Sequence, residues 1–158
     1  MLASVNSTYT DIVTAVFSST IAAKVWFASA AGFLALVQIT TAARIFGKLK
    51  RVIPWRIAGA PVNLIHRWSG RLAFLCTLPV AFHCIFILGF QTANARVLAH
   101  SIMGSFFYGA FAVKVFAVRE RALPGWALPL AGGTVFAILA TLWLTSSFWY
   151  FTTVRFGF

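Results

Sequence analysis

Residues 72–113 read LAFLCTLPVAFHCIFILGFQTANARVLAHSIMGSFFYGAFAV, and this stretch decides the fold. One charged residue, Arg96, separates two apolar runs at residues 72–95 and 97–113. A bilayer core about 30 Å thick needs about 20 apolar residues for one helical span. The long stem of Lys114 can extend the second run toward the near interface. The stretch therefore predicts two membrane-spanning helices joined by a short turn.

Two further runs without charge lie at residues 25–43 and 122–154, and the latter is too short for two spans and a turn. The chain is 61% hydrophobic and 9% charged, whereas soluble domains carry roughly 25% charged residues. We predict one all-α domain over residues 1–158, an integral membrane, antiparallel four-helix bundle. The expected spans are residues 25–46, 67–90, 97–118 and 126–150.

The net charge of +11 is distributed unevenly along the chain. Most of the 13 basic residues lie in or beside two connections: Arg44, Lys48, Lys50, Arg51, Arg56, Arg67 and Arg71 in the first, and Lys114, Arg119 and Arg121 in the second. The positive-inside rule then places both connections in the cytoplasm and both termini outside it. We interpret the basic loops as a topology signal and a contact with anionic lipid, not as a nucleic-acid site. The expected location is multi-pass in a bacterial cytoplasmic membrane.

Prolines and the polar N-terminal segment refine this picture. Pro54 and Pro61 make residues 47–66 unlikely to form one continuous helix. Pro79 falls inside the second span, where we expect a kink. Before the first span we expect a short interfacial helix around Asp11–Phe17.

His83 and His100 are the main candidates for a functional site. They lie at equal sequence distances on either side of the turn centre between residues 91 and 92. Two antiparallel helices joined there hold both imidazoles at nearly one depth, about 8–10 Å below the helix ends. An ionisable residue at such depth indicates function, because lipid does not solvate it.

Several roles remain open for this pair. Haem iron takes axial histidines, and a flat apolar macrocycle suits a bundle core, where Gly104 and Gly109 reduce the bulk of the third span. Zinc would need more ligands, and the only acids, Asp11 and Glu120, lie outside the spans. The alternatives are a polar packing pair, another metal, or a proton relay.

Three other polar residues have two interpretations each. Arg96, one turn from His100, is placed to bind a haem propionate or to anchor the outer interface. His66, about 260° around its helix from His83, is an interfacial histidine or part of a site for a quinone head or an anion. Lys114 either reaches the cytoplasmic interface or points into the bundle.

Three motifs carry a resemblance: HRWSGR at residues 66–71, LPVAFHC at 78–84 and HSIMGSFFYG at 100–109. Over about residues 63–145 the chain resembles four-helix membrane b-type cytochromes, a group that includes ferric- and ascorbate-reductase types, and it looks closest to small bacterial members. The larger family commonly binds two haems through two histidine pairs. This sequence has one matched pair, so the resemblance implies a single haem b on His83 and His100 and makes a second haem unlikely.

A single haem near the outer leaflet implies exchange on the outer side of the membrane. The chain would pass electrons between a quinol or a partner subunit and an extracytoplasmic redox protein, as an electron-transfer subunit or an oxidoreductase. The alternative is a non-redox structural or assembly subunit of a larger respiratory complex. A small transporter or proton path through His83, His100 and Lys114 is a third interpretation.

Overall fold

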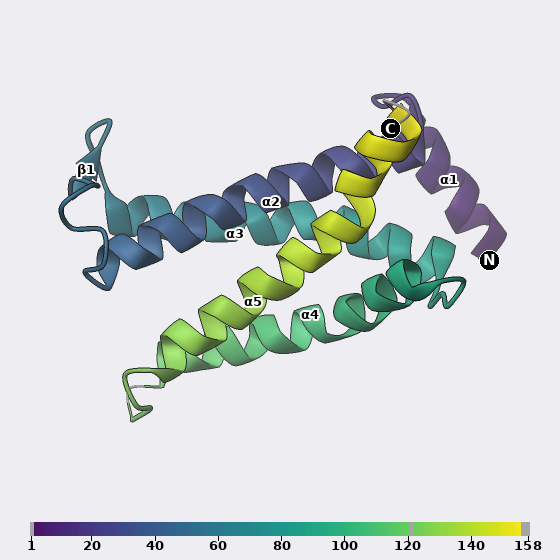
Figure 1. Ribbon diagram of the computed structural model, residues 1–158. Coiled ribbons are helices and arrows are strands. Elements are labelled where there is room, and N and C mark those ends of the chain that lie inside the picture. Colours follow the sequence, from purple (N-terminus) through teal and green to yellow (C-terminus); the bar gives the residue numbers. More distant parts are fainter. Residues whose placement is uncertain (1, 121, 156–158) are drawn as a thin grey trace.

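The computed structural model describes residues 2–120 and 122–155, which are almost entirely helical (Figure 1). In chain order the elements are α1 (Leu2–Thr14), α2 (Thr20–Ile45), β1 (Arg56–Ile57), β2 (Ala60–Pro61), α3 (Val62–Phe82), the π-helical segment η1 (His83–Leu88), α4 (Ala95–Arg119), α5 (Ala127–Trp143) and the π-helical segments η2 (Leu144–Phe148) and η3 (Tyr150–Arg155). Arg121, one of the basic residues named above, lies outside the described residues.

The prediction of four membrane-spanning helices is confirmed. Four helical stretches are long and apolar enough to cross a bilayer: Thr20–Ile45, Val62–Leu88, Ala95–Arg119 and Ala127–Val154. The first begins five residues before the expected start, because the Ser19 hydroxyl caps it by accepting the Ala22 backbone N–H at 3.0 Å. Lys24 therefore lies inside the helix. The N-terminal helix α1 also differs from the expectation, since it covers Leu2–Thr14.

The connection between α2 and α3 is interrupted, as the two prolines predict. It contains a small antiparallel hairpin of β1 and β2, which the sequence analysis did not anticipate. Ala58 and Gly59 form its turn with φ values of 48° and 80°, the left-handed conformation that tight two-residue hairpins need. Pro61 precedes α3 directly, where its missing N–H costs no helical hydrogen bond.

The helices pack as two antiparallel pairs, α2 with α3 and α4 with α5, and the pairs meet where α5 crosses α2 (Figure 1). Gly32 permits this crossing. A Cβ at that position would lie 3.3 Å from the Trp143 ring. The Trp143 indole also donates to the Ser29 hydroxyl at 3.1 Å. Small residues and interhelical hydrogen bonds are the usual means of joining helices in lipid.

The buried core lies along this crossing. Its buried members are Ala31, Ala35, Phe107, Val135, Ile138 and Leu139. Large apolar side chains such as Trp26, Phe33, Phe106 and Leu130 are exposed on the outside of the bundle. Exposed apolar surface on this scale is typical of helices whose solvent is lipid.

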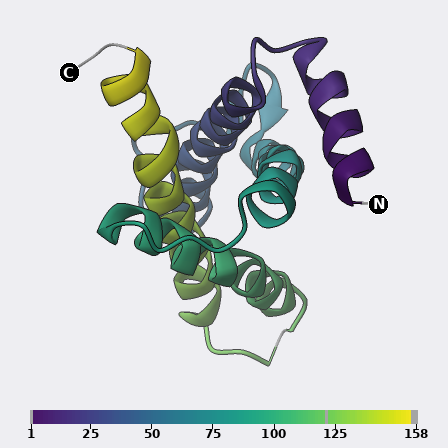
Figure 2. The ribbon, with the colours of Figure 1, turned by 90° about the vertical axis from the view of Figure 1, so that its right-hand side faces the viewer.

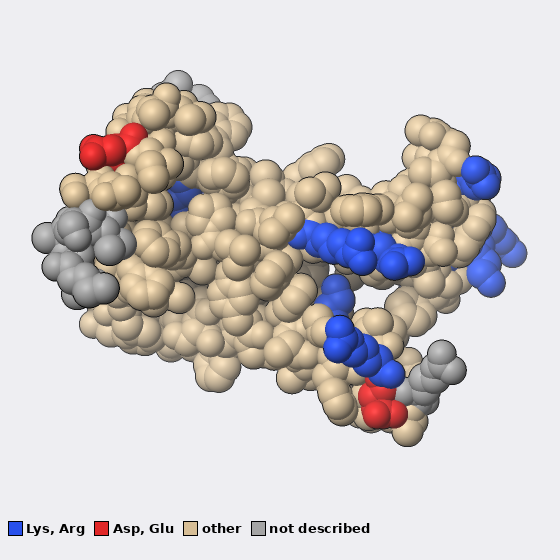
Figure 3. Space-filling model, turned by 180° about the vertical axis from the view of Figure 1, so that it is seen from behind, with Lys and Arg blue, Asp and Glu red and all other residues tan. Residues whose placement is uncertain are grey.

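Basic residues gather at one end of the molecule. Figure 3 shows most of the Lys and Arg side chains around the end formed by the hairpin and the α4–α5 connection. Both termini lie at the opposite end (Figure 1). Figure 2 shows α1 to one side of the bundle there. The charge asymmetry read from the sequence is therefore also an asymmetry of the folded molecule.

The helix that contains Pro79 continues through it. Proline lacks the N–H that would bond one turn back, yet α3 reaches Phe82 before its turns widen into η1. The His83 N–H bonds to the carbonyls of both Pro79 and Val80. The segment η1 ends at Gly89, whose φ is 67°. Widened π-helical turns inside helices are found frequently at functional sites.

Gly70→Val tests the packing of α2 on α3. The Gln38 amide donates to the Ser69 hydroxyl at 2.7 Å and to the His66 carbonyl, and a Cβ on Gly70 would lie 3.0 Å from Gln38 Oε1. The substitution should break these hydrogen bonds and lower the free energy of unfolding in detergent by ~1–2 kcal/mol more than Gly132→Val does. Gly132 is a matched control because a Cβ there meets nothing within 4 Å. Equal losses in the two variants would contradict the prediction.

Candidate functional site

A cavity of about 720 Å³ lies among the spans, toward the end where α2 and α4 begin. Its wall is mostly apolar, and it includes residues of α2, α3, η1, α4, α5 and η2. Ala28, Ala31 and Gly104 line it without filling it. Gly109, the other glycine considered for this role, does not line it. Pockets of about 300–1,000 Å³ are the usual size for organic ligands.

His100 lines this cavity, and its hydrogen-bond partner indicates which tautomer it adopts. The Thr145 hydroxyl has one proton, which it donates to the Thr141 carbonyl at 2.7 Å. Its oxygen therefore accepts the Nδ1–H of His100 at 2.9 Å. This hydrogen bond leaves the His100 Nε2 with a lone pair. A second ring nitrogen held by a hydrogen bond is the arrangement found in histidines that bind metals.

His83 is the first residue of η1, beside the cavity, but it is not among the residues that line it. Its side chain is only 2% exposed. Its Nδ1 lies 3.3 Å from the Tyr9 hydroxyl of α1, and its Nε2 is the one buried side-chain N or O atom of the described residues without a hydrogen-bond partner. A buried nitrogen without a partner is costly, and it calls for an explanation.

Tyr9 brings α1 into the site. Its ring contacts Phe82 and His83, with centroid distances of 5.1 and 5.9 Å. Burial, with a smaller contribution from Cys84, raises the pKa of the Tyr9 phenol, which stays neutral at physiological pH. The phenol can therefore accept a hydrogen bond from the His83 Nδ1–H or donate one to an unprotonated Nδ1.

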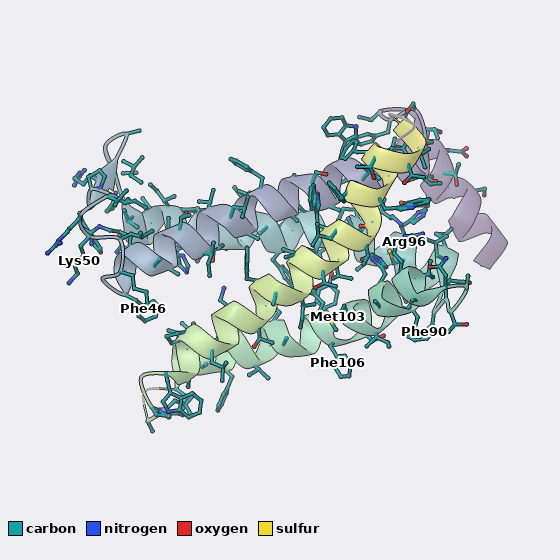
Figure 4. The ribbon with its side chains drawn as sticks, viewed as in Figure 1. Phe46, Lys50, Phe90, Arg96, Met103 and Phe106 are labelled. Carbon is teal, nitrogen blue, oxygen red and sulfur yellow. The ribbon has the colours of Figure 1, made fainter. Side chains whose placement is uncertain are left out.

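Arg96 points from α4 toward the C-terminal helix (Figure 4). One of its nitrogens, Nη1, donates to the Thr145 carbonyl at 2.6 Å, and its guanidinium lies 4.0 Å from the centre of the Trp149 ring. Arg96 and Trp149 both line the cavity. The structure therefore brings Arg96 and His100 together, as their spacing predicted.

Lys24 is a cavity residue that the sequence analysis missed. It lines the cavity from the first turns of α2 and lies within electrostatic range of both His83 and His100. The sequence did contain one indication of this role, because Lys24 directly precedes the uncharged run at residues 25–43. Thr145, which orients His100, could not be singled out from the sequence, because it is one of several hydroxyl residues in the last span.

His66 and Lys114 form a separate polar cluster in the half of the bundle nearer the hairpin. The His66 Nδ1 lies 2.8 Å from the Thr41 hydroxyl, which donates to the Val37 carbonyl at 2.6 Å. Lys114 is within electrostatic range of His66. Neither residue lines the cavity. His66 thus has a packing partner on α2.

The described residues contain no group of three or more His, Cys, Asp and Glu side chains that could hold a metal ion. A zinc ion, which takes three or four protein ligands, has no such site among them. Haem iron needs only axial ligands from the protein, because the porphyrin supplies the rest.

The tautomer of His100 is directly testable. With uniformly ¹⁵N-labelled protein in detergent, the ring nitrogens of His100 should show protonated Nδ1 and unprotonated Nε2. Thr145→Val, which removes the accepting oxygen, should shift the ring toward the other tautomer, whereas His66 in the same sample should not change. Protonation at Nε2 in the unmodified protein would contradict the assignment.

Over residues 3–158 the chain matches the family model described as "Family of unknown function (DUF6529)". No curated protein and no solved structure matches it. The family match covers all but the first two residues, the whole bundle and the cavity included. The chain therefore belongs to the DUF6529 family.

Proposed function

We propose that this chain is a membrane-bound b-type cytochrome that holds one haem b in the cavity, with His100 and His83 as the iron ligands. The observation that carries the proposal is the His83 Nε2, which is buried and lacks a partner although Nδ1 of the same ring is in contact with Tyr9. A ligand bond at Nε2 would remove that cost. The lone pair on the His100 Nε2 would be the second donor, on a ring that lines the cavity.

The cavity suits the macrocycle in size and chemistry. Its volume and apolar wall fit a flat hydrophobic ligand, and small residues rather than large ones line it at Ala28, Ala31 and Gly104. His83 fits only in part, since it is not among the residues that line the cavity. Ligation by His83 therefore requires its side chain to move toward the cavity.

The chain's own residues would set the properties of such a site. Haem supplies a one-electron carrier when it is bound. The Thr145 hydroxyl orients the His100 ring, and the mostly apolar wall would disfavour water beside a bound haem. The cavity lies at the end poor in basic residues, which the positive-inside rule assigns to the extracytoplasmic side.

This placement supports a relay on the outer side of a bacterial cytoplasmic membrane. The partners of the relay would be a quinol or a membrane subunit on one side and an extracytoplasmic redox protein on the other. A second haem near His66 has no histidine left to complete its ligands, because the chain contains three histidines in all.

Absorption spectra of the purified protein test the proposal. Protein expressed with ample haem should show Soret and α bands of a low-spin haem that dithionite reduces. His100→Ala should abolish the bound haem, and His83→Ala should abolish it or convert it to a high-spin form. His66→Ala should retain the spectrum, because His66 is outside the cavity. A colourless protein, or an unchanged spectrum in His100→Ala, would contradict the proposal and favour a structural subunit.

A second test fills the cavity without touching the ligands. Gly104→Leu places a large side chain into the cavity and should reduce haem occupancy at least about tenfold. Gly109→Leu is its matched control on the same helix, because Gly109 is exposed and outside the cavity. Pyridine haemochrome assays would give the haem content of each variant. Equal occupancy in both variants would place the haem elsewhere.

The orientation of the chain can be tested independently of any cofactor. Alkaline phosphatase fused after residue 94, in the α3–α4 turn, should be active, and the same reporter after residue 51 should be inactive. Green fluorescent protein at these two positions should give the reverse pattern. The opposite result would place the cavity on the cytoplasmic side.

A further inference from the structure

Two cations at one end of the cavity have no carboxylate partner within the part of the chain that the structure describes. Lys24 and Arg96 both line the cavity, and neither forms an ion pair with a carboxylate of the described residues. The only acids of the chain are Asp11 and Glu120, both outside the spans. An unpaired charge within a membrane-spanning segment is expensive, and such residues usually mark a ligand site or a pathway.

The two cations lie near the N-terminal ends of two different helices, and both are within electrostatic range of His100. Lys24 lies in the second turn of α2 and Arg96 in the first turn of α4. The positive end of each helix dipole also lies at the N-terminal end of the helix, close to these cations. His100 lies one turn deeper than Arg96, about 6 Å along the helix. Beyond it the wall is apolar at Ala31 and Gly104. The cavity therefore has a cationic mouth and an apolar interior.

Arg96 is held rigidly enough to bind an anion. Its Nη1 donates to the Thr145 carbonyl and its plane rests near Trp149. A guanidinium has five N–H donors, so most of them remain available. Lys24 has no hydrogen bond to the described residues and is free to point its ammonium toward the same ligand.

We infer that Lys24 and Arg96 bind the two carboxylates of a ligand whose apolar body fills the cavity. This inference rests on the proposed function, in which the ligand is haem b and the carboxylates are its propionates. It orients the haem with its propionate edge at the mouth of the cavity, between the first turns of α2 and α4. Lys24 thereby becomes a binding residue of the site.

The experiment compares haem b with its dimethyl ester, which has the same iron and macrocycle but no carboxylate charge. Haem-free protein in detergent is titrated with each compound, and absorbance gives the dissociation constant. Wild-type protein should bind haem b more tightly than the ester. Lys24→Met should weaken the binding of haem b about tenfold, the scale for loss of one charge-assisted hydrogen bond. It should leave binding of the ester nearly unchanged.

Two further variants separate charge from structure. Lys24→Arg keeps the cation and should retain most of the preference for haem b. Lys48→Met removes one positive charge from the other end of the molecule, beyond α2, and should have no effect on either compound. Circular dichroism and thermal unfolding check that each variant is folded.

The outcomes distinguish the two proposals. Equal affinity of wild-type protein for haem b and the ester overturns this inference and leaves the cytochrome proposal intact. Equal weakening of both compounds in Lys24→Met assigns Lys24 a packing role and likewise overturns the inference alone. Failure of wild-type protein to bind either compound overturns both.

Discussion

The absence of water in the hydrocarbon core governs this molecule, because every polar group placed there must find its partner inside the protein. Most do. Gln38 joins α2 to α3, Thr145 holds His100, and the Trp143 indole reaches Ser29 across the crossing of α2 and α5. Against this background one group stands out: the Nε2 of His83 is the one buried side-chain N or O atom of the described residues without a hydrogen-bond partner. It lies beside the cavity that Lys24 and Arg96 line.

The arrangement of the helices explains why a cavity exists there. Close packing runs along α2–α3, α4–α5 and the α2–α5 crossing. The α3 and α4 helices approach each other through aromatic residues further along, where the Tyr108 hydroxyl donates to the Thr77 carbonyl at 3.2 Å and its ring meets Phe74 edge-on. Above this contact, toward the termini, small residues leave the space open. The π-helical segments η1 and η2 contribute residues to that part of the wall.

Hydropathy was sufficient to predict the four spans to within a few residues, because an apolar run of that length has no other stable arrangement in a bilayer. The pairing of Arg96 with His100 also followed from sequence, since regular α-helix separates them by one turn. The direction of the His83 side chain could not be predicted from the sequence. The helix widens into η1 at that residue, so the rotation of 100° per residue of an α-helix no longer applies. Lys24 was missed because the Ser19 cap, which extends α2 past it, depends on backbone geometry. The β1–β2 hairpin was missed because strands of two residues leave no periodic pattern.

The crossing of α2 on α5 has a consequence for biogenesis. The four spans form two helical hairpins, α2 with α3 and α4 with α5, each with its own internal packing. Neither hairpin alone encloses the cavity, whose wall is drawn from all four spans. The cavity is therefore enclosed only when the two hairpins pack together, with Trp143 against Gly32. A ligand bound there would act as a clamp between hairpins made at different times, and loading it would complete maturation of the protein.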